Sequence, residues 1–381
     1  MRIFLTTDTV GGVWDHTVTL ARELFAAGHS VLVAVLGEPR DERLAHLPVG
    51  VEVTWRKYRL EWMPDAADDV AAAGAWLRRT ADLWEADVVH LNQMAYAAER
   101  FSAPVLVAVH SDVLSWFGET LDRPAPADLA GYASWVRAGV SAADVVVTPS
   151  AYQSELTLRN YGRAADRVIH NGVAAPGGAP PERSGARVVS AGRAWDPAKG
   201  ARVLDEAAGI LGEVMGGAAP PVHLLGETVS PQGERFEARH LTAHGRVERA
   251  EVDGWLGRAT VYVGASLYEP FGLAPLEAAM HGCALVLSDI GSFRELWQGS
   301  AVFFPAGDAE ALANALVQLR HDPARCAKLA AAARTRALRR YTAGRMVAEY
   351  EALYREMHAR HARSRSVPLS VSIPQTGVPV A

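Results

Sequence analysis

Residues 2–37, RIFLTTDTVGGVWDHTVTLARELFAAGHSVLVAVLG, contain the pattern that decides the fold. A short apolar run at 2–7 is followed by the glycine pair Gly11 and Gly12, and then by an amphipathic stretch, 14–27, that ends at Gly28 as many helices do. The next run, 30–36, is apolar at nearly every position, which is typical of a strand covered on both faces. The segment therefore predicts a β-α-β unit.

The same alternation of strands and helices continues to residue 173 and, after a break, to residue 343. Strands are predicted at 86–91, 105–110, 143–148, 187–191, 222–225, 260–264, 284–287 and 301–303. Strands that alternate with helices favour parallel sheets. We therefore predict an α/β protein with two Rossmann-like, doubly wound domains that face a central cleft. Ligands of open parallel sheets bind at the carboxyl ends of the strands, so the cleft is where we expect the chemistry.

The composition of the connecting segments sets the predicted domain boundaries. The first domain is predicted to span 1–173, and the second 187–343. Between them, 174–186 is rich in Pro, Gly and Ala, as linkers are. Residues 309–340 are Ala-, Leu- and Arg-rich and favour helix, and a last helix is predicted at 344–359. The tail, 363–381, has little capacity to form a core and is predicted to be disordered.

Charge and cysteine content exclude several classes of protein. The 381 residues are 49% apolar and carry a net charge of −5, whereas a protein built to hold nucleic acid usually has a basic excess. Cys283 and Cys326 are too few and too isolated for a disulfide framework or a zinc cluster. The start of the sequence lacks a signal-peptide pattern, and no apolar run approaches the roughly 18 residues of a membrane span, so we expect a cytoplasmic protein.

Two glutamates in 266–280, SLYEPFGLAPLEAAM, form the first candidate site. Seven residues separate Glu269, placed in a loop by Pro270 and Gly272, from Glu277. Pro275 predicts a helix start, which would put Glu277 in the first turn. The N-terminus of a helix can also bind a phosphate. A carboxylate there can accept hydrogen bonds from a pair of sugar hydroxyls. The alternative is that Glu277 only caps the helix and Glu269 is solvated.

Two cations in 191–200, AGRAWDPAKG, form the second candidate site. Arg193 follows a predicted strand directly, and Lys199 lies six positions later at the start of the next helix. The forked guanidinium of an arginine and the ammonium group of a lysine can together bind a diphosphate. They can also neutralise the negative charge that develops on a leaving group. Solvated surface charges are the alternative, but Lys199 is one of only three lysines in the sequence.

Weaker signals come from the first domain. Gly11 and Gly12 follow the first strand, where glycines let backbone amides approach a phosphate, although a plain tight turn is an equal explanation. His110 ends a predicted strand and is therefore placed at the cleft, although a lone histidine is more often structural. The other histidines, such as His358 and His361, lack metal-ligand spacing.

Together these motifs resemble the retaining family 4 glycosyltransferases of the GT-B fold, the group of bacterial glycogen and sucrose synthases. The resemblance covers about residues 1–358 and rests on several motifs in the right order. They are the two glutamates of EPFGLAPLE at 269–277, GR-x5-KG at 192–200, TPS at 148–150, NGV at 171–173, Gly11-Gly12 and the strand-ending His110. Ala174, where the family has Asp after NGV, and Cys283 depart from the pattern, and neither touches the proposed chemistry.

The resemblance implies a role for each matched residue. Arg193 and Lys199 would bind the diphosphate of a nucleotide-sugar donor, Glu277 the ribose hydroxyls, and Glu269 would lie beside the transferred sugar. The amides of Phe271, Gly272 and Leu273 would face the sugar and phosphate, His110 would contact the sugar, and the Gly11-Gly12 loop would close over the pyrophosphate. The last helix would cross back onto the first domain.

These roles imply hexosyl transfer with retention, without a cofactor other than the donor. A metal ion is not expected, because Arg193, Lys199 and helix amides would stabilise the charge on the leaving group, and the absence of a D-x-D triplet agrees with this. The acceptor, whether small molecule, lipid or glycan, stays open. One alternative is a dinucleotide-dependent oxidoreductase in which Glu38 binds the ribose, but the sequence lacks the GxGxxG spacing of such enzymes. The other alternative is a non-catalytic protein of the same fold. The basic-aromatic segment 55–62 allows at most a peripheral membrane contact.

Overall fold

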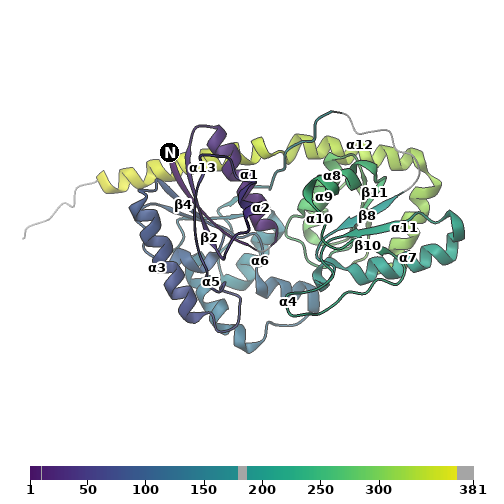
Figure 1. Ribbon diagram of the computed structural model, residues 1–381, viewed down its shortest axis with the longest axis horizontal. Helices are drawn as coiled ribbons and strands as arrows, with labels where there is room; N and C mark the ends of the chain where they lie inside the picture. The colour runs from purple at the N-terminus through teal and green to yellow at the C-terminus, as the bar shows by residue number, and fades with distance from the viewer. Residues whose placement is uncertain (10, 179–186, 367–381) are drawn as a thin grey trace, which may run out of the picture.

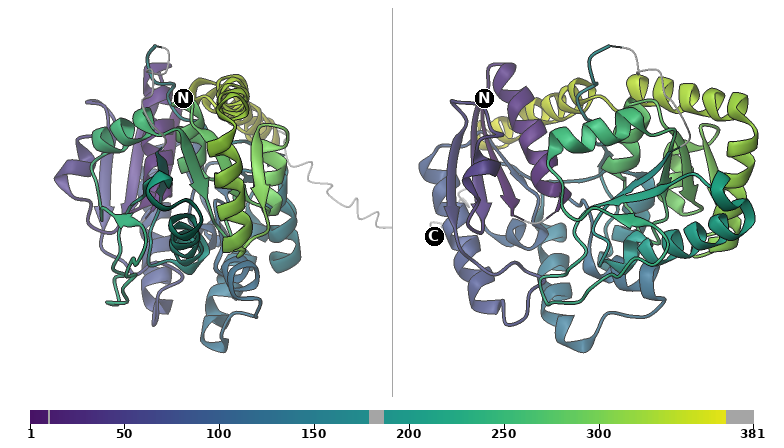
Figure 2. Two further views of the ribbon diagram at one scale, coloured as in Figure 1. Left: turned by 90° about the vertical axis from the view of Figure 1, so that its right-hand side faces the viewer. Right: turned by 45° about the vertical axis from the view of Figure 1, so that its right-hand side comes forward.

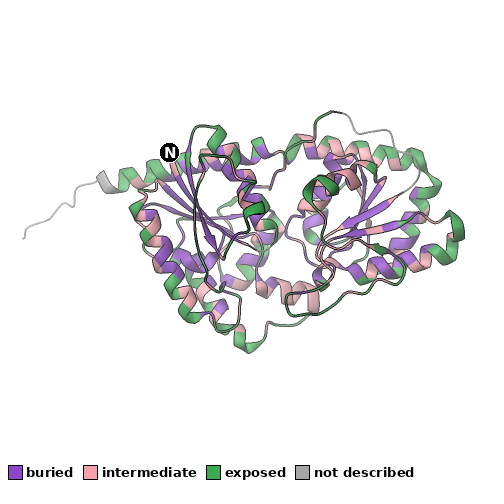
Figure 3. Cartoon of the chain, in the orientation of Figure 1, coloured by how far each residue is buried: buried purple, intermediate pink, exposed green. Residues whose placement is uncertain are grey.

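The structure is a computed structural model that describes residues 1–9, 11–178 and 187–366. Two parallel sheets lie side by side along its long axis, each with helices on both faces (Figure 1). The part built on the first sheet is called the N-terminal half below, and the part built on the second sheet the C-terminal half. In Figure 3 the central strands of both sheets are buried, while many exposed residues lie on the outer surfaces of the helices.

The N-terminal half contains a seven-stranded sheet with the order β3-β2-β1-β4-β5-β6-β7. Every residue of β4, β5 and β6 is buried, as expected for strands covered on both faces. The strands are β1 (Arg2–Asp8), β2 (Ser30–Leu36), β3 (Glu52–Arg56), β4 (Val88–Leu91), β5 (Val105–Ala108), β6 (Val145–Thr148) and β7 (Arg167–Val168). The helices are α1 (Gly12–Ala26), α2 (Asp41–Leu44), α3 (Ala67–Leu83), η1 (Met94–Ala98), α4 (Val113–Leu121), η2 (Ala127–Leu129), α5 (Ala130–Ala142) and α6 (Ala151–Tyr161).

The C-terminal half contains a six-stranded sheet with the order β10-β9-β8-β11-β12-β13. Its strands are β8 (Val188–Ala191), β9 (Val222–Leu225), β10 (Thr242–Ala243), β11 (Val261–Gly264), β12 (Ala284–Ser288) and β13 (Ala301–Phe304). Its helices are η3 (Pro197–Lys199), α7 (Ala201–Met215), η4 (Gly216–Ala218), α8 (Arg249–Arg258), α9 (Leu273–Met280), α10 (Gly291–Trp297), α11 (Ala309–His321) and α12 (Pro323–Arg340). In both sheets the strand order reverses direction at the first strand of the half, β1 or β8, which is where open α/β sheets bind ligands.

The final helix, α13 (Ala343–Ser366), leaves the C-terminal half and packs on the N-terminal one (Figure 2). Its buried side chains, among them Tyr350, Leu353 and Tyr354, share one core cluster with residues of β1 and α1. The chain crosses between the halves where Val173 bridges Thr342 in parallel. A side chain at Gly172 would bring its Cβ to 2.3 Å from the Thr342 carbonyl oxygen, so only glycine fits this crossing.

The α/β fold with two doubly wound sheets confirms the prediction from the sequence, and all the strands predicted there are present. Two helix boundaries were wrong. The helix α9 begins at Leu273 and not at Pro275, so Glu277 lies just beyond its first turn. The last helix continues past Ala359 to Ser366, so residues 363–366 are helical and do not belong to a loose tail. The rest of that tail, and 179–186 of the predicted linker, lie outside the described residues. Within the described part of the chain, no helix combines the length and the apolar character needed to cross a bilayer.

Candidate functional site

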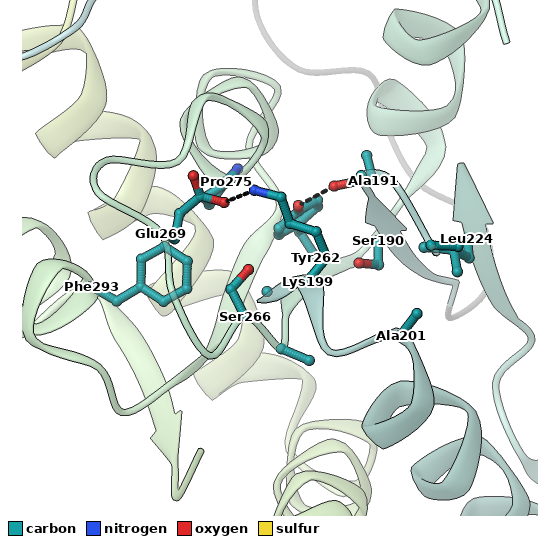
Figure 4. Close-up of a pocket in the computed structure, with 14 residues that line it drawn as sticks. Ser190, Ala191, Lys199, Ala201, Leu224, Tyr262, Ser266, Glu269, Pro275 and Phe293 are labelled. Atoms are coloured by element: carbon teal, nitrogen blue, oxygen red, sulfur yellow. Dashed lines mark hydrogen bonds and ion pairs between the residues drawn. The ribbon is translucent and has the colours of Figure 1, made fainter. Parts of the chain in front are cut away.

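Lys199 and Glu269 meet in a pocket at the carboxyl end of β8 and β11. Lys199 is the last residue of η3, and Glu269 lies in the loop that follows β11. The Lys199 Nζ is 2.6 Å from Oε2 of Glu269, and both side chains line the pocket with Ser190, Tyr262 and Ser266 (Figure 4). Their side chains are 25% and 18% exposed, so the pair is partly shielded from water.

The turn that carries Lys199 depends on a glycine. Gly200 has φ +64°, and a Cβ there would lie 2.0 Å from the carbonyl oxygen of Ala265. The absence of a side chain therefore lets η3 lie directly on the loop after β11. This close approach brings Lys199 to Glu269, although 70 positions separate them in the sequence.

Arg193 lies on the same loop and faces the N-terminal half. Its Nη2 donates to Oδ2 of Asp196 at 2.8 Å, and its guanidinium lies over the ring of Trp195. A Cβ at Gly11 would lie 3.6 Å from Nη1 of Arg193, and one at Gly12 would lie 3.6 Å from Cδ1 of Leu273. The glycine pair after β1 therefore lies against both the arginine and the first residue of α9.

Glu277 has a partner that the sequence analysis missed. Arg249, the first residue of α8, forms an ion pair with the Glu277 carboxylate. The Glu277 side chain is only 13% exposed, and burial raises its pKa while Arg249 opposes that rise. Nothing in the spacing of the sequence links α8 to α9, because the pairing depends on how the two helices pack.

The loop between Glu269 and α9 presents backbone rather than side chains. The ring of Phe271 is 3% exposed and packs edge-on against Tyr341, with ring centroids 5.6 Å apart. Gly272 has φ +89°, a left-handed conformation that favours glycine, and it precedes the first residue of α9, Leu273. The first amides of a helix have no intrahelical acceptors, so this end of α9 can bind an anion.

His110, which follows β5, is held in one tautomer by its neighbours. The amide nitrogen of Asn92 donates to the Thr6 carbonyl oxygen at 2.6 Å, which turns Oδ1 of Asn92 toward Nε2 of His110 at 2.9 Å. Burial lowers the pKa of His110 to about 4, so the ring is neutral at pH 7 with its proton on Nε2. The described residues contain no group of three or more His, Cys, Asp or Glu side chains able to hold a metal ion.

Known proteins match this chain in both halves. The model of "Glycosyltransferase Family 4" matches residues 10–175, and that of "Glycosyl transferases group 1" matches residues 185–322. The chain is a glycosyltransferase of this family 4 and group 1 type. The match favours the glycosyltransferase over the oxidoreductase alternative that the glycine pair and Glu38 left open.

Curated relatives of this glycosyltransferase align with it over most of its length. Glycogen synthase of Mycobacterium tuberculosis is 28% identical over 366 residues, which is 86% of each chain. Phosphatidyl-myo-inositol mannosyltransferase of Mycobacterium leprae is 27% identical over 373 residues, covering 88% of this chain and 90% of the relative. The names of these two relatives describe different reactions, although their sequence identities to this chain are nearly equal.

Solved structures show that the glycosyltransferase has the GT-B fold. Sucrose-phosphate synthase from Thermosynechococcus elongatus superimposes with a TM-score of 0.75 at 21% identity, over 94% of this chain and all of that one. Anabaena HepE in complex with UDP-glucose gives a TM-score of 0.70 at 19% identity, over 93% of this chain and all of that one. The predicted GT-B architecture is thereby confirmed.

Proposed function

We propose that this glycosyltransferase moves a hexose from a nucleoside diphosphate-sugar to a hydroxyl acceptor, with retention at the anomeric carbon and without a divalent metal. The observation that carries the proposal is the contact between Lys199 and Glu269 at 2.6 Å, on the loop where Arg193 faces the glycine pair. A positive group for a diphosphate and a carboxylate for a sugar hydroxyl thus share one pocket, and a second positive group, Arg193, lies on the loop that leads to it.

The donor would bind mostly to the C-terminal half. Arg193 and Lys199 hold the two phosphates, and the amides of Phe271, Gly272 and Leu273 add the positive end of α9. Glu277 accepts hydrogen bonds from the ribose hydroxyls, and Arg249 stays paired with the Glu277 carboxylate. The complexes of Anabaena HepE with UDP and with UDP-glucose support a nucleoside diphosphate-sugar as the class of donor.

The reaction breaks the bond between the anomeric carbon and the diphosphate oxygen. Negative charge grows on that oxygen, and Arg193, Lys199 and the helix amides stabilise it, which is the role a metal ion has in other transferases. The acceptor oxygen forms the new bond on the face that the diphosphate leaves, and its proton passes to the departing diphosphate oxygen. Glu269 and neutral His110 would hold the sugar hydroxyls during this step.

A binding screen with four classes of nucleotide-sugar, the UDP-, GDP-, ADP- and TDP-sugars, tests the donor class. At a hundred times its Kd, a ligand adds about 2.7 kcal/mol to the free energy of unfolding, so a true donor should raise Tm clearly, with or without EDTA. No shift with any of the four would contradict the proposal. A shift that EDTA abolishes would contradict metal independence.

Turnover distinguishes the enzyme from a non-catalytic relative. We expect slow hydrolysis of the stabilising sugar nucleotide without acceptor, and NMR of the sugar first released should show the anomeric configuration of the donor. Binding without any release of sugar, across small-molecule, glycan and lipid acceptors, would favour the non-catalytic alternative. Release of the opposite anomer would rule out retention.

A further inference from the structure

A helix of the N-terminal half reaches the turn that carries the donor-site cations. The helix α4 contacts η3 directly, although the two belong to opposite halves. The contact includes one polar bond, in which the indole Nε1 of Trp116 donates to Oδ1 of Asp196 at 3.1 Å. The N-terminal half therefore touches the turn that carries Lys199 through a tryptophan that lies outside every matched motif.

Asp196 connects this bond to Arg193. Its carboxylate is buried, with 4% of the residue exposed, and it accepts from three donors. Oδ1 takes the indole N–H of Trp116 and the backbone N–H of Ala198, both at 3.1 Å, while Oδ2 takes Nη2 of Arg193 at 2.8 Å. A buried carboxylate needs such donors, so removal of one changes how firmly the other two are held.

Apolar packing attaches the same turn to the N-terminal half. Ala198, which precedes Lys199, is 2% exposed and forms a small core cluster with Leu156 and Tyr268. Trp116 and Tyr152 pack against that cluster. Of the four side chains that pack with Ala198, those of Trp116, Tyr152 and Leu156 come from the N-terminal half, and that of Tyr268 comes from the C-terminal half. Both Arg193, through Asp196, and Lys199, through Ala198, are thus held in part by the opposite half.

We propose that Trp116 is a positioning residue for the donor diphosphate. Its N–H fixes Asp196, which in turn orients Arg193, and its ring supports the turn of Lys199. The two cations are fully placed only while the halves are in contact, so binding of the diphosphate is coupled to that contact. The inference rests on the proposed function, because it takes Arg193 and Lys199 to be the diphosphate ligands.

The variant Trp116→Phe removes the N–H donor and keeps an aromatic ring. Its affinity is measured by calorimetry for the mono- and diphosphates of uridine, guanosine, adenosine and thymidine. For the nucleoside diphosphate that binds wild type, we expect a loss of about tenfold, since hydrogen bonds to charged groups are the stronger class. The matching monophosphate, held mainly through its nucleoside, should change less than about twofold. Trp62→Phe, at a residue 39% exposed on the same half, is the matched control and should change neither.

Asp196→Ala and the double variant show whether Trp116 acts through Asp196. If it does, Trp116→Phe adds nothing to the loss already caused by Asp196→Ala. Equal losses for mono- and diphosphate, or full additivity with Asp196→Ala, would overturn the inference while the proposed function stands. If wild type binds no nucleoside diphosphate, both fail. Should Trp116→Phe not fold, Trp116→Leu, which also lacks a side-chain donor, replaces it under the same criteria.

Discussion

Lys199 and Glu269 show how much of the site depends on single side chains. The partly shielded pair leaves one positive and one negative group at the same pocket wall, 2.6 Å apart. A diphosphate with several negative charges would compete with Glu269 for Lys199. Under the proposed function the Glu269 carboxylate would then be left to the sugar hydroxyls.

Lys199→Ala should reduce kcat/KM about 100- to 1,000-fold, because it removes a fixed positive charge from the departing diphosphate. Stability should change by less than about 1 kcal/mol, since partly exposed ion pairs contribute little. Donor turnover and urea unfolding measure the two effects. Lys57→Ala, at an exposed position of the N-terminal half, is the matched control. Activity near wild type in Lys199→Ala, with every donor of the screen, would remove Lys199 from the site.

His90 predicts how stability depends on pH. It is fully buried, with Nδ1 2.6 Å from the Tyr354 hydroxyl, and burial lowers its pKa to about 3. The unfolded chain takes up a proton near the ordinary value of 6.5 and the folded chain does not, so this residue lowers stability as pH falls from 6.5 toward 3. Between pH 7 and pH 4 the stability advantage of wild type over His90→Gln should shrink by roughly 3 kcal/mol.

Urea unfolding of both proteins at pH 7, 6, 5 and 4 measures that difference. Comparison with a variant cancels the other groups that titrate in this range, such as Glu61, whose pKa burial raises to about 7. His321→Gln, at an exposed position at the end of α11, is the control. Parallel profiles for wild type and His90→Gln would show that His90 takes up its proton in the folded state.

Residues that carry a local signal could be found from the sequence, and their partners could not. Arg193, Lys199, Glu269 and Glu277 lie after strands or near Pro and Gly, so local patterns together with the family resemblance mark them as candidates. Asp196, Trp116 and Arg249 carry no comparable local pattern. Trp116 and Asp196 lie 80 positions apart in the sequence, and Arg249 and Glu277 lie 28 positions apart. The spacing of residues within a motif does not encode contacts between such distant segments.

Among the elements, strand position decided what could be predicted. The central strands are buried on both faces and therefore appear as continuous apolar runs. The strands that were missed, β3, β7 and β10, lie at the sheet edges, and β3 has four exposed residues among its five. An edge strand covered on one side or neither has no need of apolar residues, so its sequence resembles a loop.

The first turn of α6 is capped by its own Ser150 and also by a residue of the other half. Glu295, on α10, accepts the backbone N–H groups of Ala151 and Tyr152 through its two carboxylate oxygens, both at 2.9 Å. Glu295→Ala should therefore lower the free energy of unfolding by about 1–2 kcal/mol, as loss of a helix cap does. Thermal and urea unfolding measure this, with exposed Glu213→Ala on α7 as control. Equal stability of the two variants would mean that water replaces the cap without cost.

At the scale of the whole molecule, the halves are joined by more than their two covalent crossings. Ser150 donates to the Pro270 carbonyl oxygen at 2.6 Å, and Tyr268 donates to Oε1 of Gln153 at 3.0 Å. These contacts flank Glu269 in the sequence on both sides. The position of Glu269 is therefore set in part by the N-terminal half, so the relative placement of the halves affects the site.

Gly291→Ala tests that dependence away from the pocket. A Cβ at this first residue of α10 would lie 2.4 Å from Cδ2 of Tyr152, a contact that forces either the ring or the whole of α6 to move. We expect unfolding to become easier by about 1–3 kcal/mol, and the radius of gyration in X-ray scattering to increase. Gly212→Ala, in α7 with open space around the added methyl, should do neither.

If the halves must touch for the donor cations to be placed, Gly291→Ala should also weaken nucleoside diphosphate binding, although no atom of Gly291 lines the pocket. An unchanged affinity beside an increased radius would show that the C-terminal half holds the diphosphate without help.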